Sequence, residues 1–191
     1  MSHAPFRRSR ANLEAKSYDP YHYAQTVIDA NHRLVHDGMF YSHTGKDESW
    51  TNGATRNFYL SVPAGVFPHI QVMKLDFGRG DIDFVAYEGT TVSSSGTPLT
   101  AVNVNRASAN TPSLSLSAEP TVTDTGTAIF TLWAPPTSTG TGQSANGVEG
   151  VGQGSEWILN AGTNYLVRLT NNSGSTISWA HEFTWYEIDY S

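Results

Sequence analysis

The 191-residue chain contains no cysteine, so it forms no disulfide and no cysteine-ligated metal site. Charged residues make up only 15% of the chain, whereas about a quarter is usual for a globular protein. No apolar run approaches the roughly 20 residues that a membrane-spanning helix needs. The chain does not begin with an apolar leader segment, so we expect it to be soluble and not exported. Its stability must come from its own core or from assembly.

The formal net charge of −6 argues against nucleic-acid binding by the body of the protein, because neutralising phosphates requires a basic face. Residues 1–20 are the exception and are predicted to form an extended basic arm. Two interpretations of this arm stay open: a disordered tail, or a tether that contacts another molecule. Its candidate contact residues are Phe6, Arg7, Arg8, Arg10 and Lys16.

The carboxyl-terminal part of the chain carries the clearest pattern. Large side chains occupy every second position from Ile177 to Trp185, which is typical of a β-strand with one buried face. Residues 164–170 alternate in the same way, and the turn-forming residues 171–174 separate the two segments. The pattern predicts a hairpin from Glu156 to Ile188 that supplies the best-specified part of the core.

Shorter alternating segments recur every 8–12 residues or so with turn signals between them, which is typical of sandwiches and barrels. Residues 70–77 and 82–87 are predicted to form a second hairpin, with a bulge near Val72 and Met73. Residues 42–54 are predicted to be a polar loop. The predicted fold is a single-domain antiparallel β-sandwich, jelly-roll-like, over residues 21–191.

Two segments depart from the strand pattern. Residues 134–155 are rich in glycine and have no apolar period, so we expect a loop without secondary structure that becomes ordered against a neighbouring molecule. Residues 21–37 fit either a short helix or a strand that enters the turn at Asp37 and Gly38.

Candidate chemistry is sparse. His32 and His36 would share one face of a helix, but a metal site needs three or four converging ligands and the sequence shows no further partner, so we predict hydrogen-bonded or interfacial histidines and no metal. Asp81 and Asp83 are spaced as a glycosidase pair on one strand face might be, yet a solvated strand face has the same pattern. We predict no cofactor and no catalytic residues, and therefore no enzyme.

Several segments, taken in order, resemble a family of tailed-bacteriophage head decoration, or cement, proteins encoded beside capsid genes. The first of these segments, residues 28–38, is similar to the pattern I-D-x-x-H-x-x-x-H-x-G. The likeness covers most of residues 25–190 and is carried by Ile28–Gly38, Tyr87–Val92, Asn103–Arg106, Glu156–Leu159, Asn164–Asn171 and Phe183–Glu187.

This resemblance implies a structural virion protein that binds the outer surface of an icosahedral capsid and stabilises it. Its expected partners are the major capsid protein and itself, as a homotrimer, with no nucleic acid or membrane. Its expected locations are the capsid exterior and, during assembly, the host cytoplasm. His32 and His36 join the arm residues as candidate capsid contacts. The alternative is a carbohydrate-binding or adhesion module of the virion, such as a head fibre or tail component.

Overall fold

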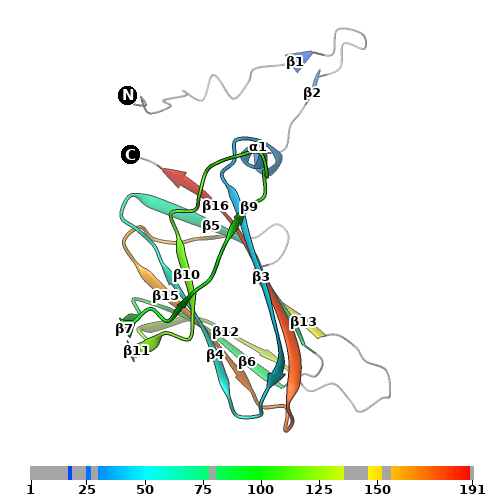
Figure 1. Cartoon of the computed structure of the whole chain (residues 1–191), viewed down its shortest axis with the longest axis vertical. Helices are drawn as coiled ribbons and strands as arrows, with labels where there is room; N and C mark the ends of the chain where they lie inside the picture. The colour runs from blue at the N-terminus through cyan, green and yellow to red at the C-terminus, as the bar shows by residue number, and fades with distance from the viewer. Residues whose placement is uncertain are drawn as a thin grey trace.

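The structure is a computed structural model, and it describes residues 17–18, 25–26, 30–77, 81–135, 146–151 and 156–189. Within these residues, two six-stranded antiparallel sheets form a sandwich (Figure 1). In order, sheet I contains β12 (Thr127–Ala134), β6 (Ile82–Glu88), β15 (Asn164–Asn171), β4 (Thr55–Ser61), β10 (Ser115–Ala118) and β8 (Thr97–Pro98). Sheet II contains β13 (Asn146–Val151), β5 (Val66–Phe77), β16 (Ile177–Asp189), β3 (Phe40–Trp50) and β9 (Val102–Asn103), with β14 (Trp157–Ile158) also paired to β5.

The remaining elements are small. They are α1 (Ala30–His36), the pair β1 (Ser17–Tyr18) and β2 (Gln25–Thr26), and the pair β7 (Thr91–Ser94) and β11 (Thr121–Asp124). The prediction of an all-β antiparallel sandwich is confirmed, whereas its jelly-roll connectivity stays a prediction. Because Ser17 and Tyr18 pair with β2, the carboxyl-terminal end of the predicted arm has paired backbone.

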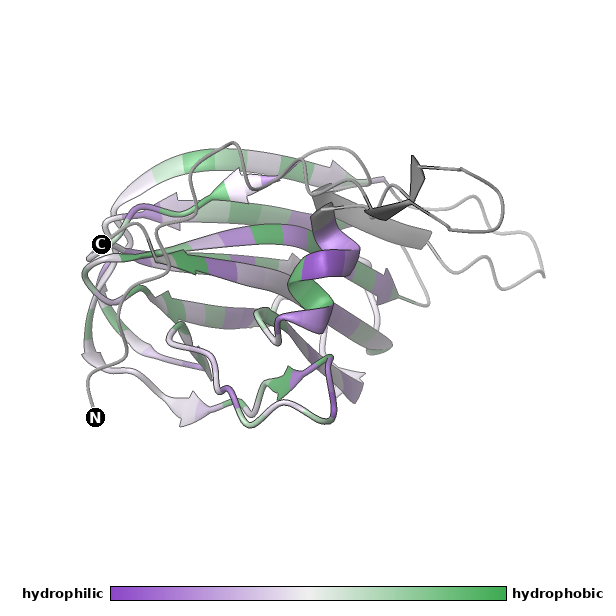
Figure 2. Cartoon of the chain, turned by 90° about the horizontal axis from the view of Figure 1, so that it is seen from above, coloured by the Kyte–Doolittle hydropathy of each residue, from purple (hydrophilic) through white to green (hydrophobic). Residues whose placement is uncertain are grey.

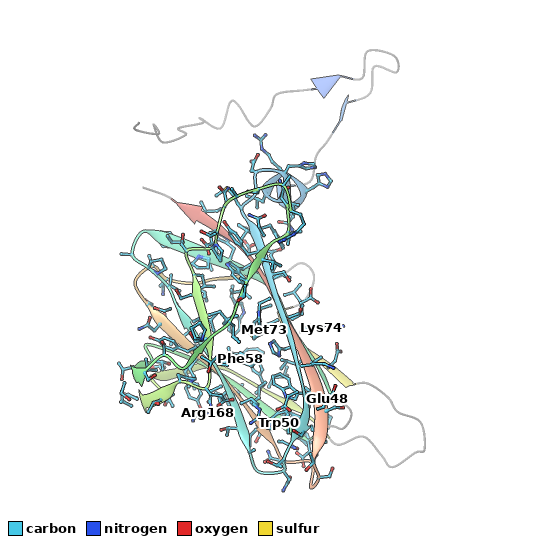
Figure 3. The ribbon with its side chains drawn as sticks, in the orientation of Figure 1. Glu48, Trp50, Phe58, Met73, Lys74 and Arg168 are labelled. Atoms are coloured by element: carbon cyan, nitrogen blue, oxygen red, sulfur yellow. The ribbon has the colours of Figure 1, made fainter. Side chains whose placement is uncertain are left out.

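The core lies between the two sheets, and the hydropathy of the strands alternates along their length (Figure 2). Phe58 of sheet I packs edge-on against Trp179 and Phe183 of sheet II, with ring centroids 5.8 and 5.1 Å apart. Trp50, Phe58 and Met73 all lie in this interior (Figure 3) and are at most 3% exposed. The predicted buried face of β16 is confirmed, because Ile177, Trp179, Phe183 and Trp185 are 1–5% exposed.

The two predicted hairpins are wrong. β15 and β16 belong to different sheets, and so do β5 and β6. Alternation determines which face of a strand is buried but not which strand lies beside it. Here β15 and β16 lie in different sheets and both contribute side chains to the same core. The side chain of Asn171, which is fully buried, holds the crossing turn by donating to the carbonyls of Trp50 and Ser175 at 2.9 and 3.0 Å.

The predicted polar loop at residues 42–54 is also wrong over most of its length, because β3 extends from Phe40 to Trp50. The sequence does not predict this strand, because polar and small residues occupy several of its inward positions. Gly45 is one of them and pairs with His181 of β16. A Cβ atom at Gly45 would lie only 2.7 Å from Nε2 of His181, so the glycine makes room for the imidazole ring.

Replacing Gly45 with alanine should therefore destabilise the protein by about 1–3 kcal/mol, as overpacked core sites do. Denaturant unfolding of Gly45→Ala, His181→Ala and the double variant measures this cost. We expect the alanine at position 45 to cost much less when His181 is already truncated, because the clash is then absent. Equal costs in both backgrounds would show that the ring is not what excludes a side chain.

Two details of β5 complete the comparison with the sequence. The predicted bulge is confirmed close to its expected position, because the pairing with β16 skips Gln71 between Ile70 and Val72. The expectation that residues 134–155 lack secondary structure is wrong for Asn146–Val151, which forms β13 and pairs with β5. An edge strand needs only main-chain hydrogen bonds on one side, so it can form without an apolar pattern.

Candidate interaction surface

The open question at residues 21–37 is answered for its last part, because Ala30–His36 forms the helix α1. The helix ends in a Schellman motif: the Gly38 amide donates to the Val35 carbonyl and the Met39 amide to the Leu34 carbonyl, both at 3.0 Å. Gly38 has a φ of +69°, which this motif requires and glycine accepts without strain. The cap fixes where α1 ends and where β3 begins.

His32 and His36 come together on the exposed side of α1, as their spacing predicts for a helix. Their Nε2 atoms are 2.8 Å apart and their ring centroids 4.6 Å apart. Arg33 and Asp37 form a neighbouring exposed ion pair at 3.4 Å. Hydrophilic residues predominate along α1 in the view from above (Figure 2). The helix therefore presents a polar surface with a histidine pair at its centre.

Asparagine side chains from residues 103–110 attach α1 to the sandwich. Asn105 donates to the His36 carbonyl at 3.0 Å. Asn103, which is 7% exposed, donates to the Gly38 carbonyl at 2.8 Å, and Asn110 donates to the same carbonyl at 3.2 Å. These bonds satisfy carbonyls at the helix end that no intrahelical amide can reach.

A second set of polar contacts links α1 to the outer face of sheet II. Asn31 donates to Gln71 at 3.2 Å, and Gln71 donates to the Glu156 carboxylate at 2.6 Å. The Tyr186 hydroxyl donates to the same carboxylate at 2.8 Å, and its ring stacks on His69 at 4.4 Å between centroids. The bulge at Gln71 thus places a side chain that connects the helix to β5 and β16.

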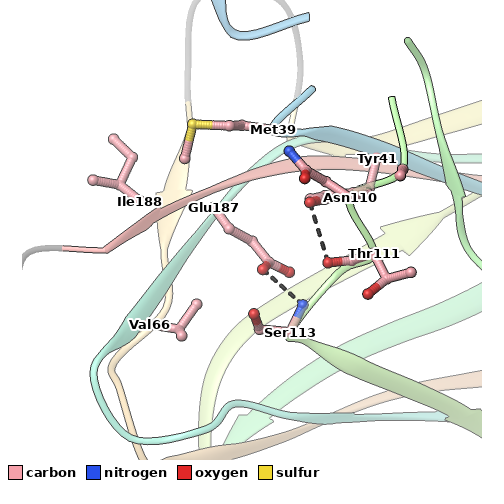
Figure 4. Close-up of a pocket in the computed structure, with 9 residues that line it drawn as sticks. Met39, Tyr41, Val66, Asn110, Thr111, Ser113, Glu187 and Ile188 are labelled. Atoms are coloured by element: carbon pink, nitrogen blue, oxygen red, sulfur yellow. Dashed lines mark hydrogen bonds between the residues drawn. The ribbon is translucent and has the colours of Figure 1, made fainter. Parts of the chain in front are cut away.

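A pocket of about 450 Å³ opens between the start of β3, the start of β5, the end of β16 and residues 109–113 (Figure 4). Glu187 lies in it and is 7% exposed. Its carboxylate accepts hydrogen bonds from the amides of Ser113 and Leu114 at 2.8 and 2.9 Å and from Trp185 Nε1 at 3.0 Å. Burial and this negative charge together raise the pKa of the Tyr41 hydroxyl. Both carboxylate oxygens are engaged, so Glu187 acts as a structural anchor for residues 109–114.

We call α1, residues 103–113 and the Glu187 pocket the α1 end. The sequence prediction included its histidine pair but missed its anchor. A signal was present, because position 187 continues the inward series 177, 179, 181, 183 and 185. An acidic residue at a core position must find several hydrogen-bond donors.

A second histidine pair, His43 and His181, lies between the sheets with ring centroids 5.3 Å apart. Within the described residues, neither ring nitrogen of His181 has a hydrogen-bond partner. Burial, with a smaller contribution from His43, lowers the pKa of His181 to about 4. This histidine is therefore neutral in the folded protein near pH 7 and fills space between the sheets.

Acidification should weaken the fold through His181. Its pKa is about 4 in the folded chain and about 6.5 when unfolded, so the unfolded state binds more protons between these values. The stabilising contribution is complete above about pH 6.5 and is lost as the pH falls towards 4. Denaturant unfolding between pH 4 and 7 should show a steeper loss for the wild type than for His181→Gln. Parallel profiles would contradict this assignment.

The other sequence predictions have different outcomes. Phe6, Arg7, Arg8, Arg10 and Lys16 lie outside the described residues. The carboxylates of Asp81 and Asp83 each accept a hydrogen bond from a side chain, from Trp133 Nε1 at 3.1 Å and Asn172 Nδ2 at 2.8 Å, respectively.

In the part of the chain that the structure describes, no three or more histidines and acids are grouped so as to hold a metal ion. The described helix is also too short and polar to cross a membrane. No protein-family model matches the chain, and no curated protein matches it significantly.

Proposed function

We propose that this protein is a structural virion protein that binds the outer surface of an icosahedral phage head and stabilises the shell. The observation that carries the proposal is the arrangement at the α1 end. One of the segments that resemble decoration proteins, Ile28–Gly38, includes an exposed, capped helix with its histidine pair. In the chain nine residues separate this helix from the basic arm of residues 1–20, so both sets of candidate contacts lie close together in sequence.

The proposed attachment to the shell depends on many weak contacts. A single exposed ion pair contributes only about 0–1 kcal/mol. Several basic residues on one arm, repeated in each copy of a homotrimer, would bind a shell of major capsid protein through multivalency. The sandwich would supply rigidity, and the α1 end would supply the orientation of the arm. The site of action is the capsid exterior, reached from the host cytoplasm during assembly.

Binding to purified heads that lack the protein tests this proposal. Co-sedimentation should show saturable binding by the full chain that weakens with salt. A chain that begins at Ser17 keeps the β1–β2 pair but loses the basic residues, and it should bind at least about tenfold more weakly. His32→Ala with His36→Ala should also weaken binding.

The matched control is Lys46→Ala, which removes a cation whose ion pair with Glu48 is 74% exposed on sheet II. It should bind heads as the wild type does. If the full chain fails to bind heads, or if the shortened chain and Lys46→Ala behave alike, the proposal fails.

A specific observation favours carbohydrate binding as a second candidate. Trp133 on the edge strand β12 is 55% exposed and lies directly opposite Asp83 of β6. Its indole N–H donates to Asp81 and Asn172 donates to Asp83, which orients both carboxylates near the ring. An exposed indole face beside acceptor and amide groups is suited to stacking on a sugar ring and bonding its hydroxyls.

A glycan array with the full chain tests this candidate. Trp133→Ala should abolish binding to any glycan that the wild type retains. Ile158→Ala, which truncates another side chain that is 54% exposed, should not. An array without a reproducible ligand would remove the candidate and leave the capsid proposal untouched.

A further inference from the structure

The histidine pair on α1 has the geometry of a metal chelate. His32 and His36 lie one helical turn apart, and their Nε2 atoms converge to 2.8 Å on the exposed side of the helix. The backbone beneath them is held by the Schellman motif at Gly38 and by the bond from Asn105 to the His36 carbonyl. Ligands on a fixed helix bind metal better than ligands on a loop, because less motion is lost on binding.

The separation of the two nitrogens can be compared with the separation that each coordination geometry requires. With metal–nitrogen bonds of about 2.0–2.1 Å, two ligands at 90° to each other lie about 2.9 Å apart, and two at the tetrahedral angle lie about 3.3 Å apart. The observed 2.8 Å is a hydrogen-bond distance between the two rings, and it lies nearer to the separation for a square-planar or octahedral ion than to the tetrahedral one. Among nitrogen-binding ions, Cu²⁺ and Ni²⁺ prefer such geometries and zinc prefers the tetrahedral one.

We propose that His32 and His36 form a two-nitrogen chelate for a divalent ion of the Cu²⁺ or Ni²⁺ kind, with its other positions left to water or to a neighbouring molecule. Binding through both Nε2 atoms requires each ring to carry its proton on Nδ1. Without the ion, one Nε2–H donates to the other nitrogen, and this hydrogen bond keeps the two rings close together. Arg33 and Asp37 form an ion pair with each other on the same helix.

This inference is independent of the proposed function, since it concerns the ion alone. It departs from the prediction of no metal that was drawn from the sequence, because the structure brings two ligands together and the chelate takes its remaining positions from water. The exposure of both rings leaves the ion accessible from outside. A third ligand from a capsid protein or from a second copy of the chain would strengthen the binding of the ion.

The test is calorimetric titration of the full chain with Ni²⁺ and, separately, with Cu²⁺. All proteins carry His3→Ala, so that this histidine of the basic arm contributes no nitrogen ligand. The parent should bind one ion per chain. His32→Ala and His36→Ala should each weaken binding at least about tenfold, since each leaves a single imidazole. Arg33→Ala keeps both rings and should bind within about twofold of the parent.

Electron paramagnetic resonance of the Cu²⁺ form gives a second readout. It should show two imidazole nitrogens in the parent and in Arg33→Ala, and fewer in either histidine variant. Circular dichroism checks that each variant is folded. Unchanged stoichiometry and affinity in the double variant His32→Ala/His36→Ala would overturn the proposal, as would a parent that binds neither ion.

Discussion

Replacing Trp185 with alanine should lower the free energy of unfolding by about 3–5 kcal/mol, as large-to-small changes of buried aromatic residues do. Trp185 is 1% exposed, and its ring lies 5.9 Å from that of Tyr41 between centroids. It also donates to the Glu187 carboxylate, so its loss leaves both a cavity and a missing hydrogen bond. A typical domain is stable by only about 5–15 kcal/mol, so the variant should unfold at a much lower urea concentration.

The matched control for this experiment is Trp133→Ala, which truncates a tryptophan that is 55% exposed. Its cost should stay below about 1 kcal/mol, as for most surface substitutions. A loss below about 1 kcal/mol for Trp185→Ala would contradict the packing of β16 against the core.

Replacing Glu187 with alanine should cost about 3 kcal/mol or more. The substitution removes the acceptor for two buried donors and one part-buried donor, and each hydrogen bond to a charged group contributes about 1.5–3 kcal/mol without full additivity. The amides of Ser113 and Leu114 should also exchange their hydrogens much faster, because residues 109–114 lose their anchor. Urea unfolding and amide exchange together measure the global and the local effect.

Glu48→Ala is the control for this second experiment, because the Glu48 side chain is 74% exposed and its removal leaves no buried donor. The variant should match the wild type in both measurements. If Glu187→Ala unfolds like Glu48→Ala, the pocket does not depend on the carboxylate. If only Ser113 and Leu114 lose protection, Glu187 anchors the loop but contributes little to the whole fold.

The sequence predicts which face of a strand is buried better than it predicts which strands lie beside each other. The period of two identifies the buried side of β16, since burial acts on each residue separately. It cannot distinguish a hairpin from a crossing between sheets, because β15 and β16 would bury the same residues either way. The difference is made by long-range packing and by the buried Asn171 turn, neither of which has a local signature.

The failure to predict two of the strands, β3 and β13, has a different cause. The inward side of β3 carries His43, Gly45 and Asp47, because it faces an imidazole ring and the Arg56 guanidinium instead of an apolar layer. Such a strand looks like a polar loop. β13 was missed because an edge strand can be held by backbone pairing alone.

The candidate site was predictable in part. The spacing of His32 and His36 predicts their proximity if the segment is helical, and the structure supplies the helix. The pocket was not predictable, since Glu187 meets residues that lie 73 or 74 positions earlier in the chain. Its acidic side chain at an inward position was the one local sign that such partners must exist.

A cryo-electron microscopy map of phage heads that carry the protein is the most direct test of the proposed role. We predict density for the β-sandwich on the outer surface of the shell, with α1 and its histidine pair turned towards the major capsid protein. The preceding basic residues should continue onto the shell. Heads without this density, or a sandwich attached by another face with α1 turned to solvent, would contradict the account.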